Sequence, residues 1–202
     1  MREPQWKSYT AKIVEPILTP AQCQTLIQLG QAQPKVEGEV LSSENQLNRT
    51  QRQNTVSWIP FSMAQEIYGI IYSWMERTNS NFFGFEDIKA VEPGQYAEYS
   101  KGDFYDWHID IPVQMQRMPP VRKISMTLLL NDPKEFKGGN LDIFTGTLDT
   151  DHSIYKNINS EIGKLKQGQP IFFASFLLHR VRPILEGKRK SLIMWFGGKP
   201  LK

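Results

Sequence analysis

The chain has 202 residues, of which 40% are hydrophobic and 22% are charged, and its formal net charge is +3. This length predicts one globular domain over residues 1–202, because single all-β domains commonly reach about 200–250 residues. Neither nucleic acid nor a membrane is expected as a partner, because the net charge is small and no apolar run approaches the roughly 18 residues that span a bilayer. Cys23 is the only cysteine, which excludes an internal disulfide and favours a reducing compartment, the cytoplasm.

Two helices are expected in the first part of the chain, as a helical support region over residues 1–80. The first begins at Thr19-Pro20, where an N-cap threonine is followed by proline at the first helical position. The second opens at Pro60 and runs to about Asn79. Its apolar residues form a stripe that predicts a core-facing surface: Met63, Ile67, Ile70, Ile71, Trp74 and Met75.

The remainder of the chain, residues 81–198, reads as short strands separated by Gly, Pro, Asn and Asp. Strands are expected near residues 85–91, 95–99, 105–110, 122–130, 139–144, 163–166, 170–174, 179–183 and 190–196. Helices followed by many short strands indicate a mainly β (α+β) fold, a sandwich or barrel with helices on one side.

The stretch that carries chemistry ends in His108 and Asp110. If it is a strand, both side chains point to the same face, because strand side chains alternate. An imidazole and a carboxylate in a common space make up two-thirds of a facial metal site. Alone, so short a motif is more often a core-edge histidine beside a turn aspartate.

A third ligand candidate, His179, follows the hydrophobic run 171–178. Ten residues later, Arg189 begins a strong strand in which alternation places four residues on one face: Arg189, Ser191, Ile193 and Trp195. A buried arginine is costly without an anion, and its planar fork suits a carboxylate. The third histidine of the chain, His152, lies in a polar stretch and is expected to be solvated.

Taken together, these residues and their order resemble the non-haem Fe(II), 2-oxoglutarate-dependent oxygenases. The similarity is greatest to the prolyl 4-hydroxylase branch, including its small bacterial and phage hydroxylases. It covers roughly residues 90–198. Besides the residues above, it includes Tyr99-x-x-Gly102 leading to Tyr105, Ser125 to Asn131, Phe136-x-Gly-Gly-x-Leu141, and a closing segment with Gly168, Phe172, Phe173, Ser175, Val181, Pro183, Gly187 and Trp195.

The resemblance implies a double-stranded β-helix (jelly-roll) core with the two N-terminal helices as support. It implies Fe(II) held by His108, Asp110 and His179, with 2-oxoglutarate and dioxygen as co-substrates and ascorbate as an optional reductant. The far carboxylate of 2-oxoglutarate would pair with Arg189, although a slip of one residue would give this role to Lys188 or Lys190. Further pocket residues are expected to be Tyr99, Tyr105, Thr127 and Trp195.

One departure from the family concerns a pocket tyrosine, because Leu129 stands where some relatives have it. Thr127 or Tyr99 would then supply the hydroxyl group.

The nearest likeness is to enzymes that act on prolyl residues, so a proline-containing peptide or protein is the expected substrate. A free amino acid is the alternative within the same class, and the low charge gives nucleic-acid demethylation little support. A non-catalytic jelly-roll binding module is the alternative from another class, and it would leave the triad and the arginine unexplained. A hydrolytic cupin-like site would show a His-x-His pair followed by Glu, which this sequence lacks.

Overall fold

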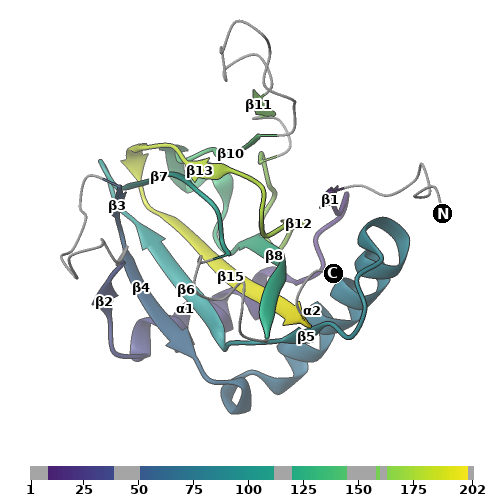
Figure 1. Ribbon diagram of the computed structural model, residues 1–202. Coiled ribbons are helices and arrows are strands. Elements are labelled where there is room, and N and C mark those ends of the chain that lie inside the picture. The colour runs from purple at the N-terminus through teal and green to yellow at the C-terminus, as the bar shows by residue number, and fades with distance from the viewer. Residues whose placement is uncertain (1–8, 39–50, 112–119, 145–157, 160–162, 200–202) are drawn as a thin grey trace, which may run out of the picture.

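The computed structural model describes residues 9–38, 51–111, 120–144, 158–159 and 163–199. These residues form a mostly β structure with two α-helices (Figure 1). His152, singled out above, lies outside the described residues. No helix in the described parts of the chain is long and apolar enough to cross a membrane.

The larger sheet has eight strands, and all its neighbouring strands are antiparallel. Its spatial order is β1 (Thr10–Lys12), β12 (Pro170–Ala174), β8 (Val121–Leu129), β15 (Arg189–Gly198), β6 (Gly94–Tyr99), β4 (Thr55–Ile59) and β2 (Val36–Glu37), and β5 (Lys89–Ala90) also pairs with β15. The first 80 residues therefore contribute strands to the sheet as well as helices.

The smaller sheet carries two of the expected metal ligands on adjacent strands. Its order is β11 (Ile158–Asn159), β10 (Leu141–Phe144), β13 (His179–Val181), β7 (Phe104–His108) and β3 (Arg52–Gln53). A two-stranded ribbon of β14 (Ile184–Gly187) and β9 (Phe136–Gly138) completes the β structure of the described residues. The stretch 163–166, expected as a strand, contains none.

Two α-helices cover the outer face of the larger sheet. Helix α1 (Pro20–Ala32) begins with a capping box at Thr19, whose side chain accepts from the Gln22 N–H. Helix α2 (Gln65–Thr78) follows a short 3-10 turn, η1 (Phe61–Met63), and continues into a π-helical turn, η2 (Asn79–Phe83). A third short turn, η4 (Pro133–Glu135), connects β8 to β9.

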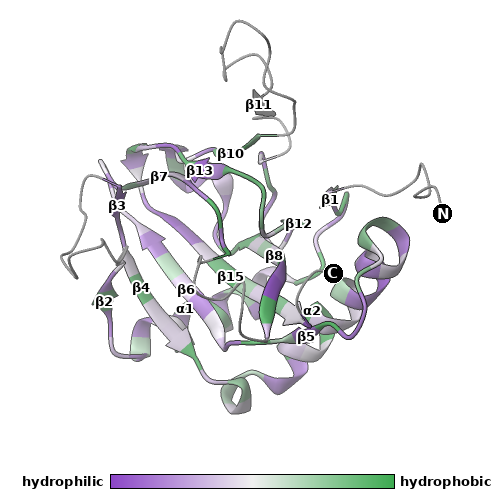
Figure 2. Ribbon diagram, viewed as in Figure 1, coloured by the Kyte–Doolittle hydropathy of each residue, from purple (hydrophilic) through white to green (hydrophobic). Residues whose placement is uncertain are grey.

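Alternation along the central strands separates two hydrophobic clusters. Leu192 and Met194 of β15 join the helices in the outer cluster, whereas Ile193 packs in the inner cluster between the sheets. Bands of hydrophobic and hydrophilic residues accordingly alternate along β6 and β8 (Figure 2). The division of β15 into two faces, predicted from alternation, is confirmed, and the polar residues of the inner face are therefore positioned between the two sheets.

Candidate metal and cosubstrate site

The three expected metal ligands lie together although they are far apart in the sequence. His108 ends β7 and His179 begins β13, and these two residues are direct register partners. Asp110 follows β7, where its backbone N–H donates to the Ser175 carbonyl. The ligand atoms of the three side chains lie within 4.8 Å of one another, and their side chains are at most 9% exposed.

The hydrogen bonds of the two imidazoles fix which nitrogen faces Asp110. Nδ1 of His108 lies 2.7 Å from the Asp106 carbonyl oxygen, and Nδ1 of His179 lies 2.9 Å from that of Leu177. A carbonyl oxygen only accepts, so each Nδ1 carries a proton, and in the neutral ring Nε2 presents a lone pair. The two Nε2 atoms lie 3.7 and 3.5 Å from the Asp110 carboxylate oxygens.

In the neutral rings, the Nε2 lone pairs of His108 and His179 face the Asp110 carboxylate, and a cation between these atoms would stabilise the arrangement. Two neutral imidazoles and one carboxylate are the donor set of a facial non-haem iron site, which leaves coordination positions open for small ligands. The residues present therefore fit Fe(II).

Buried hydroxyl and indole groups surround the Asp110 carboxylate. Ser125 Oγ donates to Asp110 Oδ2 at 2.6 Å and lies 2.9 Å from Ser175 Oγ. Burial raises the pKa of Asp110, but the neighbouring imidazole rings, when protonated, and the hydrogen bond from Ser125 Oγ lower it, and the pKa lies below the usual value. Asp110 is therefore held as a carboxylate, the form that binds metal.

Trp195, expected as a cosubstrate-pocket residue, lies at the Asp110 end of the inner face. Its buried Nε1 has no hydrogen-bond partner among the described residues. The Arg122 guanidinium stacks on its ring at 3.9 Å, donates to the Asp110 carbonyl at 3.3 Å and pairs with Glu92. Arg122, Ser125 and Ser175 were not singled out as site residues; only the inward alternation of β8 could have indicated Ser125.

An aromatic stack holds the first histidine. The ring of Tyr105 lies parallel to that of His108, with centroids 3.4 Å apart. The guanidinium of Arg52, on β3, lies 4.5 Å from the centroid of the Tyr105 ring. Burial raises the pKa of Tyr105 to about 12, so its hydroxyl stays protonated. Tyr105 is thus positioned to restrict rotation of the His108 ring.

Arg189 lies at the opposite end of β15 from Trp195 and is 3% exposed. Its hydrogen bond goes to Ser191 Oγ at 3.0 Å, its register partner is Tyr99, and no carboxylate among the described residues pairs with it. By contrast, Lys188 is exposed and forms an ion pair with Glu98 at 2.8 Å. Of the candidates at positions 188 to 190, Arg189 is the one whose charge is buried without an anion.

The Gly138-Gly139 turn gives this arginine its space. Both residues have positive φ, at 80° and 63°, a conformation that glycine adopts readily. A Cβ atom on Gly139 would lie 3.0 Å from Arg189 Cδ and 2.3 Å from Ile184 Cδ1. A larger residue at position 139 would therefore collide with Ile184 and crowd the Arg189 side chain.

Thr127 lies on the inner face of β8 between the two ends of the site. It is 6% exposed, and its register partner on β15 is Ile193. Along this face Ser125 marks the metal end and Leu129 the arginine end. Four residues of strand separate them by roughly 13 Å.

A fold of this kind with a two-histidine, one-aspartate cluster defines a class of protein, the non-haem iron enzymes of the jelly-roll type. The 2OG-Fe(II) oxygenase superfamily matches residues 94–197, slightly more than half of the chain. The chain belongs to this superfamily, so it is an enzyme that uses Fe(II) and 2-oxoglutarate and catalyses hydroxylation.

Among curated relatives, a PKHD-type hydroxylase of Xanthomonas campestris pv. campestris (strain B100) is 25% identical over 184 residues, which cover 89% of this chain and 75% of the relative. A PKHD-type hydroxylase of Synechococcus sp. (strain CC9605) is 31% identical over 111 residues, 55% of this chain and 44% of that protein.

Among solved structures, the viral collagen prolyl hydroxylase of Paramecium Bursaria Chlorella virus-1 in its 2OG complex has a TM-score of 0.66 at 21% identity and covers 95% of this chain and 97% of its own. A prolyl hydroxylase from Trichoplax adhaerens, in complex with a hypoxia inducible factor peptide fragment, has a TM-score of 0.69 at 17% identity. The match covers 94% of this chain and 84% of that protein's chain. At these identities the structural similarity establishes the fold.

Proposed function

We propose that the chain is a peptidyl-proline hydroxylase whose single domain over residues 1–202 has a double-stranded β-helix core supported by the two N-terminal helices. Its Fe(II) would be held by His108, Asp110 and His179, and the far carboxylate of its 2-oxoglutarate by Arg189. The convergence of two imidazole nitrogens and a carboxylate oxygen within 4.8 Å carries this proposal. The buried guanidinium without an anion, on the same inner face, supports it.

Bound Fe(II), with 2-oxoglutarate and dioxygen, supplies the oxidising power that places one oxygen atom into a C–H bond, while 2-oxoglutarate is converted to succinate and carbon dioxide. The protein positions the reactants and excludes water. The hydrogen bonds from Nδ1 of the two imidazoles to backbone carbonyls would orient both rings so that Nε2 can hold the metal. Ser125 orients the Asp110 carboxylate by its hydrogen bond.

Arg189 would form a two-pronged ion pair with the dicarboxylate, because its buried guanidinium has donors to spare and no competing carboxylate. Burial lowers its pKa below the usual value, but an arginine remains charged at neutral pH. Tyr99 lies beside it, with the guanidinium 5.7 Å from the ring centroid. Tyr99 and Thr127 are the inner-face hydroxyl groups that we assign to the pocket wall, with Tyr105 and Trp195 at its metal end.

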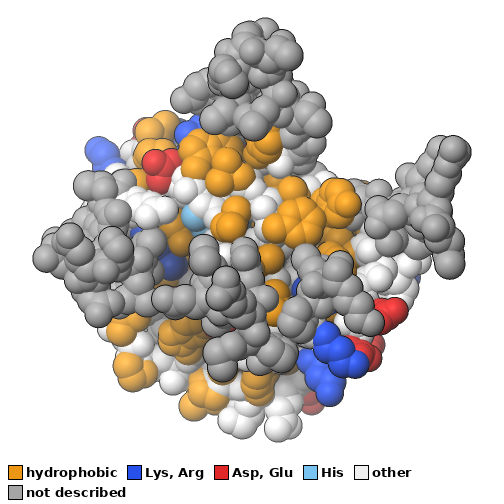
Figure 3. Space-filling model, viewed as in Figure 1, with side chains coloured by type: hydrophobic (Ala, Val, Ile, Leu, Met, Phe, Trp, Pro, Cys, Tyr) orange, Lys and Arg blue, Asp and Glu red, His pale blue; other side chains and the backbone are white. Residues whose placement is uncertain are grey.

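The face around the metal cluster favours a polypeptide substrate. Tyr9, Ile109 and Phe176 are exposed there by 50%, 43% and 38%, and the rings of Tyr9 and Phe176 meet edge to face at 5.3 Å. In Figure 3, histidine atoms are visible among hydrophobic side chains on this face. An apolar rim suits an extended chain better than a small charged amino acid. The prolyl hydroxylases of the same fold, one solved with a peptide, support this choice.

The experiment is succinate release with Fe(II) and 2-oxoglutarate over a panel of proline-containing peptides, with free proline as the comparison. We expect turnover with at least one peptide, and mass spectrometry should show a gain of one oxygen atom on its proline. Matched peptides with alanine in place of proline should be inert. Turnover with free proline and none with any peptide would contradict the peptide assignment.

A further inference from the structure

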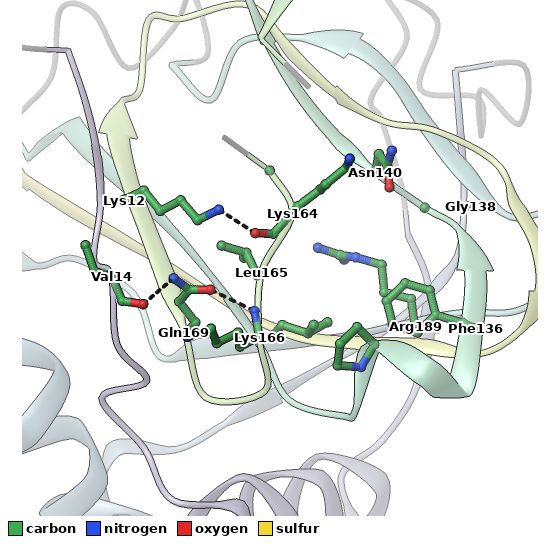
Figure 4. A pocket seen from close by; sticks show the side chains of 14 residues that line it. Lys12, Val14, Phe136, Gly138, Asn140, Lys164, Leu165, Lys166, Gln169 and Arg189 are labelled. Carbon is green, nitrogen blue, oxygen red and sulfur yellow. Dashed lines mark hydrogen bonds between the residues drawn. The ribbon is translucent and has the colours of Figure 1, made fainter. Parts of the chain in front are cut away.

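The two ends of the proposed site are held in different ways. At the cosubstrate end, Arg189 lies in the wall of a cavity of about 670 Å³, together with Leu129 and Gly139 (Figure 4). At the metal end, two of the ligands belong to the smaller sheet, in which β10, β13 and β7 are neighbours (Figure 1). His108 and His179 point to the inner face of this sheet, so a group on its outer face acts on them only through the strands.

Strand β7 contains a β-bulge directly before its metal ligand. The register of β7 against β13 shifts by one residue between two pairs, His179 with His108 and Val181 with Tyr105. One extra residue of β7 is therefore inserted before His108, as in a β-bulge. In a regular strand Tyr105 and His108, three positions apart, would point to opposite faces, yet their rings stack with centroids 3.4 Å apart. The bulge therefore brings both rings to the inner face.

The bulge also sets the hydrogen bond of the first histidine. Its residues are Asp106 and Trp107, which together stand opposite Arg180. The Asp106 carbonyl accepts the hydrogen bond from His108 Nδ1 at 2.7 Å. The ladder of backbone hydrogen bonds is disrupted at a bulge, so side-chain contacts contribute more to its conformation there than in a regular strand. The orientation of the His108 ring therefore depends on what holds Asp106 and Trp107.

A charged and aromatic cluster on the outer face holds this bulge. The Arg180 guanidinium lies over the Trp107 ring, 4.7 Å from its centroid. Its Nε donates at 2.8 Å to Oδ2 of Asp142, a fully buried carboxylate that is the register partner of Arg180 on β10. A planar guanidinium that is anchored through Nε keeps its face available to the indole. Arg180 thus connects three strands, because it lies on β13 and contacts Asp142 of β10 and Trp107 of β7.

Arg182 shares the carboxylate with Arg180 but not the aromatic ring. Its Nε also donates to Asp142 Oδ2, at 2.7 Å, and its side chain is 43% exposed, against 25% for Arg180. Among the ring contacts of the described residues, Arg180 is the arginine that lies over Trp107. The two arginines therefore offer matched variants, because each removes one ion pair with Asp142 and only one of them releases the bulge.

We propose that Arg180 is a positioning residue of the metal site, which acts through Trp107 on the β7 bulge and so on the orientation of the His108 imidazole. This inference rests on the proposed function, because it takes His108 as a ligand of Fe(II). Without the Arg180 contact the bulge is free to relax, and the Asp106 carbonyl no longer fixes His108 Nδ1. Loss of a group that orients a ligand typically lowers metal affinity about 10–100-fold, although the group does not touch the metal.

The first test is calorimetric titration of the metal-free protein with Mn(II), in the wild type, Arg180→Met and Arg182→Met. Methionine replaces the arginine by an unbranched apolar side chain and removes the cation. Arg180→Met should bind Mn(II) about tenfold or more weakly than the wild type, and Arg182→Met should bind it as the wild type does. A purely structural role would lower the melting temperature of Arg180→Met and leave its Mn(II) affinity unchanged. That result, or equal losses of affinity in the two variants, would overturn the proposal.

The second test is a double-mutant cycle between Arg180 and Trp107. Trp107→Leu should weaken Mn(II) binding about as much as Arg180→Met does, whereas Trp107→Phe keeps an aromatic face for the guanidinium and should lie closer to the wild type. The double variant Arg180→Met/Trp107→Leu should bind about as weakly as either single variant, because each change removes the same contact. Additive losses of affinity would show that the two residues act separately and would contradict the proposal.

A third measurement needs no metal. At mildly alkaline pH, NMR spectra of the imidazole nitrogens in the metal-free protein distinguish the Nδ1–H form of a neutral histidine from the Nε2–H form. His108 should be in the Nδ1–H form in the wild type and in Arg182→Met, and partly in the Nε2–H form in Arg180→Met. His179 should keep the Nδ1–H form in all three proteins.

An unchanged His108 spectrum in Arg180→Met would overturn this inference and leave the proposed function standing. A wild-type protein that binds no Mn(II) would overturn the proposed function, and with it the role of Arg180 at a metal site.

Discussion

His108 and His179 are register partners on the antiparallel strands β7 and β13, and their ring centroids lie 4.1 Å apart. Strand pairing therefore brings together two imidazoles that the sequence separates widely. Two protonated rings at this distance would repel each other, so the site favours neutral rings. In a neutral ring, the backbone carbonyl at Nδ1 places the single proton on that nitrogen.

The stability of the metal-free protein should depend on pH through His108. Burial, followed by the neighbouring His179, lowers the pKa of His108 from 6.5 to about 3. Between these values the unfolded chain binds the proton and the folded chain does not, so the free energy of unfolding falls as pH decreases from 6.5 toward 3. The slope from this group is at most about 1.4 kcal/mol per pH unit.

Urea unfolding of the metal-free wild type and of His108→Gln at several pH values between 4.5 and 7 measures this contribution. The wild type should lose stability relative to the variant as the solution is acidified. A difference between the two proteins that stays constant over this range would contradict the assignment of a depressed pKa.

The Ser125 hydroxyl should matter for metal affinity out of proportion to its effect on stability. Ser125→Ala removes the 2.6 Å hydrogen bond to Asp110, and the loss of such a partner typically lowers metal affinity about 10–100-fold. The matched control is Ser57→Ala, because Ser57 is also fully buried and donates at 2.6 Å, to the Gly30 carbonyl outside the site.

Both serine variants should lose about 1 kcal/mol of stability. Only Ser125→Ala should show weaker Mn(II) binding by calorimetry. Equal metal affinity in the two variants would show that the hydrogen bond does not position Asp110.

Replacing Arg189 should separate cosubstrate binding from folding. In Arg189→Met the dicarboxylate loses its ion pair, which should weaken 2-oxoglutarate binding by about 2–5 kcal/mol, roughly 30-fold or more. The metal-free, cosubstrate-free protein should keep or gain stability, because the variant removes a buried charge that has no carboxylate partner among the described residues. Arg189→Lys should bind with intermediate affinity.

The measurements are the dissociation constant of 2-oxoglutarate and the melting temperature without ligand. A loss of melting temperature in Arg189→Met with unchanged 2-oxoglutarate affinity would assign Arg189 a structural role instead.

Alternation of side chains along a single strand correctly predicted which residues of β15 face the inside of the protein. It placed Ile193 on the inner face of β15 and Leu192 and Met194 on the other, because a central strand is buried on both sides. It could not find groups whose role depends on a neighbouring strand. Ser125 acts on Asp110 only through the convergence of β8 with the end of β7.

The same limit applies to Arg180 and Arg182, because alternation along their own strand does not show which groups of the neighbouring strand they meet. Both donate through Nε to Oδ2 of Asp142, a fully buried carboxylate on β10, at 2.8 and 2.7 Å. Asp142 and Arg180 are register partners, and register between strands distant in sequence cannot be read from either strand. The prediction of a strand at 163–166 is wrong. Leu165 is buried there, but this stretch pairs with no neighbouring strand.

Whether His179 completes a catalytic iron site is tested most directly by Fe(II)-dependent conversion of 2-oxoglutarate to succinate in wild type, His179→Ala and His152→Ala. We expect His179→Ala to abolish turnover, because two remaining ligands do not hold the metal, and His152→Ala to retain it. Full turnover in His179→Ala, or equal loss in both variants, would contradict the assignment of the metal ligands on which the proposed function depends.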